Sequence, residues 1–230
     1  MSASSRPLSE FERTKLADLL FAAPVIAWYC YAVVRDYQPF AGLVWQIMIG
    51  AGTLATYANM AARIGSFAFS LFVIAFLIAR APPVGKSRGM LPKLVATLGA
   101  FLGVAFLGLP IADLPPWLGI FSALLILVGS LYSIYALSFL GRSFSVLPEA
   151  RRLVTSGPFS WMRHPVYFGE EIALIGVMLQ FKQPWSLLLI VVQFGFQIAR
   201  MAYEENILAD VFPDYSSYKA RTARLIPGLY

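Results

Sequence analysis

The segment LVTSGPFSWMRHPVYFGEE, residues 153–171, joins a long apolar region to a final pair of apolar helices. It contains the only histidine of the chain, His164, between Arg163 and Pro165. Proline fits the first turn of a helix, because its missing N–H would have no helical partner there. The sequence therefore predicts a polar segment that leads directly into a membrane helix beginning at Pro165.

The composition indicates an integral membrane protein. Of 230 residues, 59% are apolar and 13% are charged, whereas about half are apolar and about a quarter charged in soluble proteins. The apolar residues form long blocks, as membrane spans require. The net charge of +6 does not indicate a nucleic-acid partner, because the basic residues lie between apolar blocks, as the positive-inside rule predicts. We therefore expect an all-α, polytopic membrane helix bundle, multi-pass in a bacterial inner membrane.

We expect about six membrane-crossing segments, and five to seven are compatible with the sequence. They cover residues 16–34, 60–79, 94–109, 117–140, 165–180 and 185–212. The apolar tract 41–79 is too long for one helix across a hydrocarbon core of about 30 Å, so residues 41–59 are expected to lie along the interface or re-enter. Both termini, with the basic residues Arg6 and Arg13 at the first, then face the cytoplasm. Counting the tract as two spans would place the N-terminus outside.

The last two crossing segments form a hairpin that carries two polar clusters. His164 and Tyr167 are three residues apart and share a helix face, which Glu171 continues. The final helix outlasts the hydrocarbon core, so Glu204 and Glu205 should lie at the membrane edge. Arg200 could pair with Glu204 four residues on, and Glu205 is then unexplained. A non-functional alternative is that these charges simply reach the headgroups or pair with each other.

These polar clusters match a known group of membrane enzymes. The run Gly157-Pro158-Phe159 to Arg163-His164-Pro165-Val-Tyr167-Phe-Gly169, followed by Glu204-Glu205 and Arg224-Leu-Ile-Pro227, closely resembles the isoprenylcysteine carboxyl methyltransferase and phospholipid methyltransferase family. The resemblance covers roughly the last ninety residues. It implies S-adenosylmethionine as cofactor, no metal, and a lipophilic acceptor from the bilayer: an isoprenylcysteine carboxylate, a phospholipid amine or another small lipid. Oligomeric state is not indicated.

The resemblance also implies which residues act. One continuous membrane domain would combine N-terminal spans, residues 1–140, with a catalytic region, residues 141–230. The implied catalytic residues are Arg163, His164 and Glu205. The implied cofactor-binding residues are Gly157, Pro158, His164, Tyr167, Gly169, Glu204, Glu205 and Tyr215. A carboxylate acceptor would need a cationic group such as Arg163 to orient it, whereas an amine or hydroxyl would need His164 or Glu205 as base.

The sequence departs from the family pattern twice and leaves two other classes open. Phe159 stands where a tyrosine is usual, and Pro213 where a glycine is usual. The run 165–170 also resembles membrane steroid and enone reductases that use NADPH, although the Thr155-Ser-Gly-Pro approach and the paired glutamates favour a methyltransferase. A non-catalytic membrane protein of the same fold is the third class.

Overall fold

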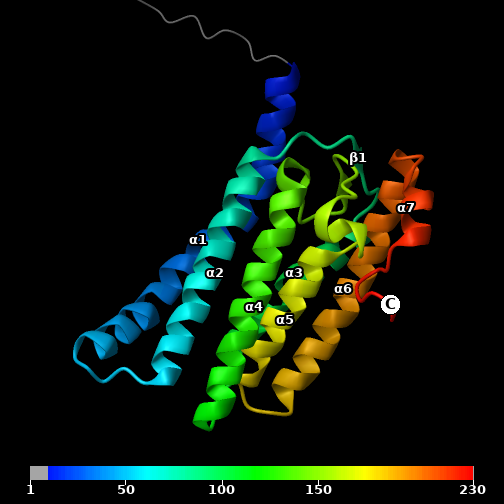
Figure 1. Ribbon diagram of the computed structural model, residues 1–230. Helices are drawn as coiled ribbons and strands as arrows, with labels where there is room; N and C mark the ends of the chain where they lie inside the picture. The colour runs from blue at the N-terminus through cyan, green and yellow to red at the C-terminus, as the bar shows by residue number, and fades with distance from the viewer. Residues whose placement is uncertain (1–9, 230) are drawn as a thin grey trace, which may run out of the picture.

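The computed structural model describes residues 10–229, and most of them lie in helices packed as one bundle (Figure 1). The α-helices are α1 Glu10–Met48, α2 Leu54–Ala79, α3 Leu91–Phe101, α4 Pro116–Leu140, α5 Pro165–Leu179, α6 Trp185–Val211 and α7 Tyr215–Arg221. Three 3-10 helices are η1 Leu102–Gly108, η2 Gly141–Ser143 and η3 Gly157–Ser160. The strands β1 Gly85–Lys86 and β2 Glu149–Ala150 pair antiparallel. The expected all-α bundle is confirmed.

Five helical segments of the described chain are long and apolar enough to cross a membrane. They are Lys15–Met48, Leu54–Ala79, Leu91–Gly108, Pro116–Ser143 and Trp185–Val211. Helix α5 has 15 residues, fewer than a typical span, and packs closely along α4 inside the bundle. The protein is therefore a multi-pass membrane protein, and α5 is the short partner of α6 that the sequence predicted.

The first helix differs from the prediction. Helix α1 continues through Arg35 and Asp36, which form an ion pair at 2.7 Å on the helix surface. It ends at Met48, and after a short turn the Thr53 side chain caps α2 by accepting a hydrogen bond from the Thr56 N–H at 3.2 Å. The expected helix end near residue 34 is therefore wrong, whereas the position of residues 41–59 relative to the membrane interface stays a prediction. Because charges in membrane segments are tolerated when they pair with one another, this ion pair is compatible with a helix that continues past both residues.

The polar connections gather at one end of the bundle. The start of α1, the connection that carries β1 and helix α7 lie at the same end in Figure 1, whereas the α1–α2 and α5–α6 turns lie at the other end. This arrangement agrees with six crossing segments between the start of α1 and α7. Which membrane face this end occupies stays a prediction, and Arg6 lies outside the described residues.

Helices α4 and α5 approach each other very closely. A Cβ atom added at Gly129 would lie 2.4 Å from the backbone nitrogen of Ala173, and one added at Gly169 would lie 2.4 Å from the Ser133 hydroxyl. The Ser133 hydroxyl also donates to the Val166 carbonyl at 3.3 Å. Small residues let helix backbones meet in this way in membranes. The contact fixes the position of the N-terminal end of α5. The sequence Arg163-His164-Pro165, which we call the RHP motif, lies at this end.

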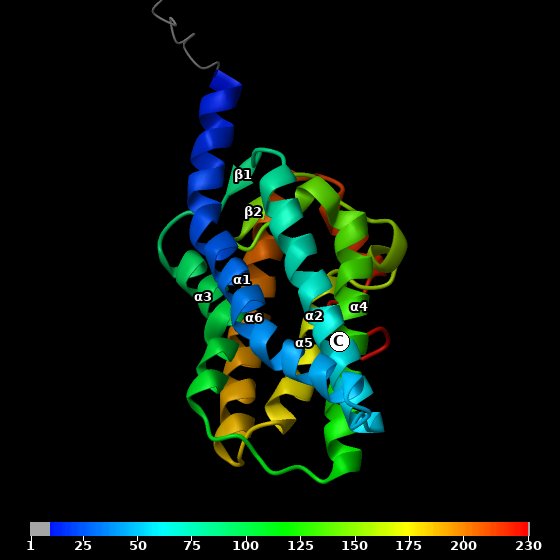
Figure 2. The same cartoon turned by 90° about the vertical axis from the view of Figure 1, so that its left-hand side faces the viewer.

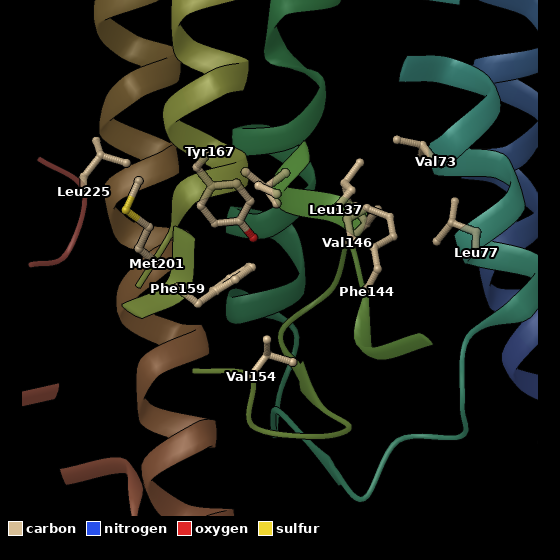
Figure 3. Packing of buried hydrophobic residues seen from close by; sticks show 12 residues of the cluster. Val73, Leu77, Leu137, Phe144, Val146, Val154, Phe159, Tyr167, Met201 and Leu225 are labelled. Carbon is tan, nitrogen blue, oxygen red and sulfur yellow. The ribbon is translucent and has the colours of Figure 1, made fainter. Parts of the chain in front are cut away.

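The main buried apolar cluster lies under the polar end. It joins side chains of α2, α4, α5 and α6 to the 144–159 segment and the C-terminal tail (Figure 3). Leu77, Leu137 and Met201 are fully buried in it. In contrast, large apolar residues such as Leu20 and Val34 are exposed on α1, as expected for a lipid-facing surface. The interior packing therefore supports the polar loops, and the outer face fits the bilayer.

Candidate functional site

A cavity of about 100 Å³ opens at the polar end of the bundle. Its wall combines aromatic, acidic and basic side chains from the loop after α4, from η3, from the start of α5, from the end of α6 and from α7. They include Phe144, Glu149, Arg151, Arg152, Phe159, Arg163, His164, Tyr167, Glu204, Tyr215 and Tyr218. We call it the polar-end pocket.

His164 and Tyr167 share a face, as the sequence predicted. His164 immediately precedes α5, and its ring stacks on the Tyr167 ring with centroids 5.4 Å apart and planes 7° from parallel. The Tyr167 hydroxyl donates a hydrogen bond to the Glu204 carboxylate. Glu171 does not continue this face into the pocket, because it lines a different cavity and accepts a hydrogen bond from Gln193 at 3.1 Å.

The buried side chain of Arg200 contacts both Tyr167 and Glu204. Its Nε donates to the Glu204 carboxylate at 3.2 Å, which confirms the predicted pair four residues apart. Its guanidinium carbon lies 4.5 Å from the centre of the Tyr167 ring, within cation–π range. A third contact runs from Nη2 to the Val146 carbonyl at 2.9 Å. Arg200 is 2% exposed, so it is a buried cation whose contacts fix Tyr167 and Glu204.

Glu205 binds four basic side chains behind the pocket wall. Its Oε1 lies 2.9 Å from Arg163 Nε, 2.9 Å from Arg224 Nε and 3.3 Å from His164 Nε2, and its Oε2 lies 3.1 Å from Lys219 Nζ. The residue is 1% exposed and does not line the pocket. One buried carboxylate thus joins the RHP motif to the C-terminal tail.

Backbone contacts fasten the tail to the same motif. The N–H groups of Arg163 and His164 donate to the carbonyls of Ala223 and Arg224 at 2.9 and 3.1 Å. The Tyr218 hydroxyl donates to the Phe159 carbonyl at 2.8 Å. Burial raises the pKa of Tyr218 to about 12, so this hydroxyl keeps its proton at neutral pH. The tail is therefore part of the pocket wall and not a loose extension.

The pocket brings together five of the residues implied by the family resemblance: Arg163, His164, Tyr167, Glu204 and Tyr215. Gly157, Pro158 and Gly169 do not line it. Gly157 has φ of +60°, and an added Cβ would lie 2.3 Å from the Phe139 ring. Pro158 is fully buried, and Gly169 packs on α4. Packing accounts for all three, and a role in binding a cofactor stays a prediction.

The sequence reasoning missed a buried charge network that supports one side of the pocket. Asp18 of α1 accepts hydrogen bonds from Arg80 Nε at 2.7 Å and from Arg151 Nη2 at 3.0 Å. Arg151 Nη2 also donates to Glu149 at 2.7 Å. The partners are far apart in sequence. The available signal was that Asp18 is the third residue of the first apolar block, residues 16–34, since such a charge needs a partner.

The comparisons with known proteins include a match over most of the segment that builds this pocket. A family model described as phospholipid methyltransferase matches residues 117–215. Phosphatidylethanolamine N-methyltransferase of Mus musculus is 33% identical over 113 residues, which are 49% of this chain and 49% of that protein. Protein-S-isoprenylcysteine O-methyltransferase B of Arabidopsis thaliana is 33% identical over 118 residues, which are 48% of this chain and 60% of that protein.

A further relative bears a different name. The cobalt-zinc-cadmium resistance protein CzcN of Cupriavidus metallidurans is 31% identical over 78 residues, 34% of this chain and 36% of that protein. The matches thus cover at most 60% of the three relatives' own lengths. Residues 117–215 thus resemble the phospholipid methyltransferase family, and the similar proteins include a phosphatidylethanolamine N-methyltransferase and an isoprenylcysteine O-methyltransferase.

Proposed function

We propose that the protein transfers a methyl group from S-adenosylmethionine to a lipophilic acceptor at the cytoplasmic face of the membrane. The observation that carries the proposal is the polar-end pocket, which combines groups of both charge signs with aromatic rings in the segment that matches the methyltransferase family. Its position at the edge of a membrane bundle would let a water-soluble cofactor and a bilayer-soluble acceptor approach from different sides.

The residues of the pocket fit the cofactor. Glu204 can meet the cationic amino group, and Arg163 can meet the carboxylate. Phe159 and Tyr215 offer aromatic surface for the adenine or the sulfonium. The Tyr215 side chain is 1% exposed, and within the described structure its hydroxyl has no hydrogen-bond partner. A buried polar atom without a partner is unusual, and a bound cofactor would supply one.

The chain contributes positioning and exclusion of water. When bound, S-adenosylmethionine supplies a methyl group on a positively charged sulfur. Glu205 holds Arg163 and His164 in fixed orientations, and the docked tail closes the pocket from the aqueous side. Orientation and desolvation of this kind account for much of the rate enhancement in many enzymes. We therefore assign Glu205 a positioning role, and we propose that its partners Arg163 and His164 contact the ligands directly.

His164 has the geometry to accept a proton. If its Nε2–H donates to Glu205, its Nδ1 is left as the acceptor nitrogen. An amine or hydroxyl acceptor would lose its proton to this nitrogen, whereas a carboxylate acceptor would need only Arg163 for orientation. A His164→Gln variant separates these cases, since it would reduce turnover strongly only for an acceptor that must lose a proton.

The proposal is tested by titrating detergent-purified protein with S-adenosylhomocysteine, the product of methyl transfer, and in parallel with NADPH. We expect S-adenosylhomocysteine to bind, the Glu204→Gln variant to weaken that binding at least about tenfold because a charged hydrogen-bond acceptor is lost, and Asp210→Asn to leave it unchanged. Asp210 is a matched control, because it is an exposed carboxylate on the same helix outside the pocket. Binding of NADPH alone would indicate a reductase, and binding of neither ligand to folded protein would refute an enzymatic role.

A further inference from the structure

A larger, open cavity of about 470 Å³ lies at the same end of the bundle as the polar-end pocket. We call it the arginine cavity. Its wall consists of residues that follow the ends of α2, α4 and β2, namely Ala81, Pro82, Arg142, Ser143, Arg151 and Arg152. Figure 2 shows the pair of strands beside the polar ends of α1 and α2, which agrees with this placement. The described wall thus carries three guanidinium groups and no acidic side chain.

Arg142 is held in place by the end of α2. Its Nε donates to the Ala79 carbonyl at 3.0 Å, and its own carbonyl accepts a hydrogen bond from the Ala81 N–H at 2.9 Å. A cation is stabilised beside the last carbonyls of a helix, so this contact explains one part of the guanidinium. The other two nitrogens, Nη1 and Nη2, donate to no residue between 10 and 229. They are therefore available to a ligand in the cavity.

Arg151 provides an independent sign of an absent ligand. It is 7% exposed, and its Nη2 binds the carboxylates of Asp18 and Glu149 at 3.0 and 2.7 Å. Its Nε is also buried, but within the described residues this nitrogen has no hydrogen-bond partner. Buried N–H donors normally have an acceptor. Because Arg151 lines the arginine cavity, an anion bound there can supply the acceptor.

The other two arginines of the wall lack acidic partners. Arg142 and Arg152 are exposed, and among residues 10–229 neither forms an ion pair. Basic residues near the ends of membrane helices are common on the cytoplasmic side of a membrane. Here, however, three of them surround one cavity, and one of the three presents a buried donor without an acceptor. This grouping indicates a site for an anion.

The surroundings of the cavity favour a lipid phosphate over a soluble anion. Guanidinium groups bind phosphate oxygens through paired, charge-assisted hydrogen bonds, and basic pockets at the ends of membrane helices bind lipid headgroups. Leu71 and Ile78 are exposed on α2 and lie seven residues apart, on one helix face. This apolar face leads to Ala81 and Pro82 in the cavity wall. An acyl chain that follows it places the headgroup beside the arginines.

We propose that the arginine cavity binds the phosphate of an anionic lipid, for which phosphatidic acid is the simplest example. The Nε of Arg151 and the guanidinium nitrogens of Arg142 and Arg152 donate to the phosphate oxygens, and the acyl chains lie along the outer face of α2. The headgroup of phosphatidic acid is a phosphate alone, with no amine, carboxylate or hydroxyl group. The proposed ligand is thus not an acceptor of the proposed methyl transfer, and the site does not depend on that reaction.

The test is binding of radiolabelled dioleoylphosphatidic acid to the full protein, immobilised in dodecyl maltoside. We expect saturable binding that an excess of phosphatidylcholine or of inorganic phosphate does not displace. Arg142→Gln should weaken binding at least about tenfold, since it removes a charged hydrogen-bond donor. Arg88→Gln is the matched control and should bind like the native chain, because Arg88 is an exposed arginine between α2 and α3 that does not line the cavity.

A second variant covers the case in which Arg142→Gln disturbs the end of α2. Ala81→Trp fills the cavity and leaves its three arginines in place, so it should also abolish saturable binding. Retention of full binding in either variant, with folding judged by circular dichroism and gel filtration, would overturn the proposal.

Three other results would also contradict a lipid phosphate site in this cavity. Equal weakening by Arg88→Gln would show a diffuse attraction to basic loops. Displacement by inorganic phosphate at the concentration of the lipid would assign the cavity to a soluble anion. Arg151 and Arg152 line the polar-end pocket as well, so displacement by S-adenosylhomocysteine would show that the lipid occupies that pocket instead.

Discussion

Replacing Glu205 with glutamine should release the C-terminal tail while leaving the membrane bundle intact. Glu205 is 1% exposed and contacts Arg163, His164, Lys219 and Arg224. Two of these partners come from the RHP motif and two from the tail. The variant therefore removes a carboxylate that joins the two segments, and it leaves their positive charges facing each other.

The expected magnitude follows from how buried the partners are. The Arg163 side chain is 9% exposed, whereas Lys219 is 48% exposed and Arg224 is 22% exposed. Breaking a buried ion pair costs about 3 kcal/mol or more, and exposed pairs add at most about 1 kcal/mol each. A loss of about 3 kcal/mol shifts the ratio of docked to released tail roughly a hundredfold.

Hydrogen–deuterium exchange of the amides in residues 212–229 measures this release. We expect their protection in Glu205→Gln to fall by about two orders of magnitude, while peptides from α4 keep theirs. Binding of S-adenosylhomocysteine should fall in parallel, because the tail supplies Tyr215 and Tyr218 to the pocket wall. Unchanged protection of the tail would refute the argument that Glu205 holds it, whatever happens to ligand binding.

Three further changes probe the same architecture through thermal unfolding in detergent. Asp18→Asn leaves the buried Arg80 guanidinium without its anion, removes one of the two anions that bind Arg151, and should lower the free energy of unfolding by about 3–5 kcal/mol. Gly169→Ala places a methyl 2.4 Å from a hydroxyl oxygen of α4 and should cost about 1–3 kcal/mol, whereas Gly195→Ala, with no atom within 4 Å, should not lower stability. Burial raises the pKa of Tyr218 to about 12. The contribution of its hydroxyl to the free energy of unfolding should therefore be complete below about pH 10 and fall as the pH rises towards 12. Tyr218→Phe should flatten that alkaline decline, since it removes the titrating hydroxyl that bonds Phe159.

The hairpin of the site was predictable because its determinants are local. Pro165 opens α5 and Pro184 precedes α6, and the spacing of His164 to Tyr167 sets their stacking through helix geometry alone. The pair between Arg200 and Glu204 follows from the same periodicity. Each of these features depends on residues within one or two helical turns, so the sequence contains them directly.

One error was local, because Arg35 and Asp36 look like the end of a membrane helix until their mutual ion pair is seen. The other arose where distant partners change the meaning of a residue. Asp18 looks like an isolated charge in the sequence. In the folded chain it pairs with Arg80 and Arg151, which lie 62 and 133 residues further along the sequence. Such partners depend on tertiary packing, and a periodic pattern along one segment cannot reveal them.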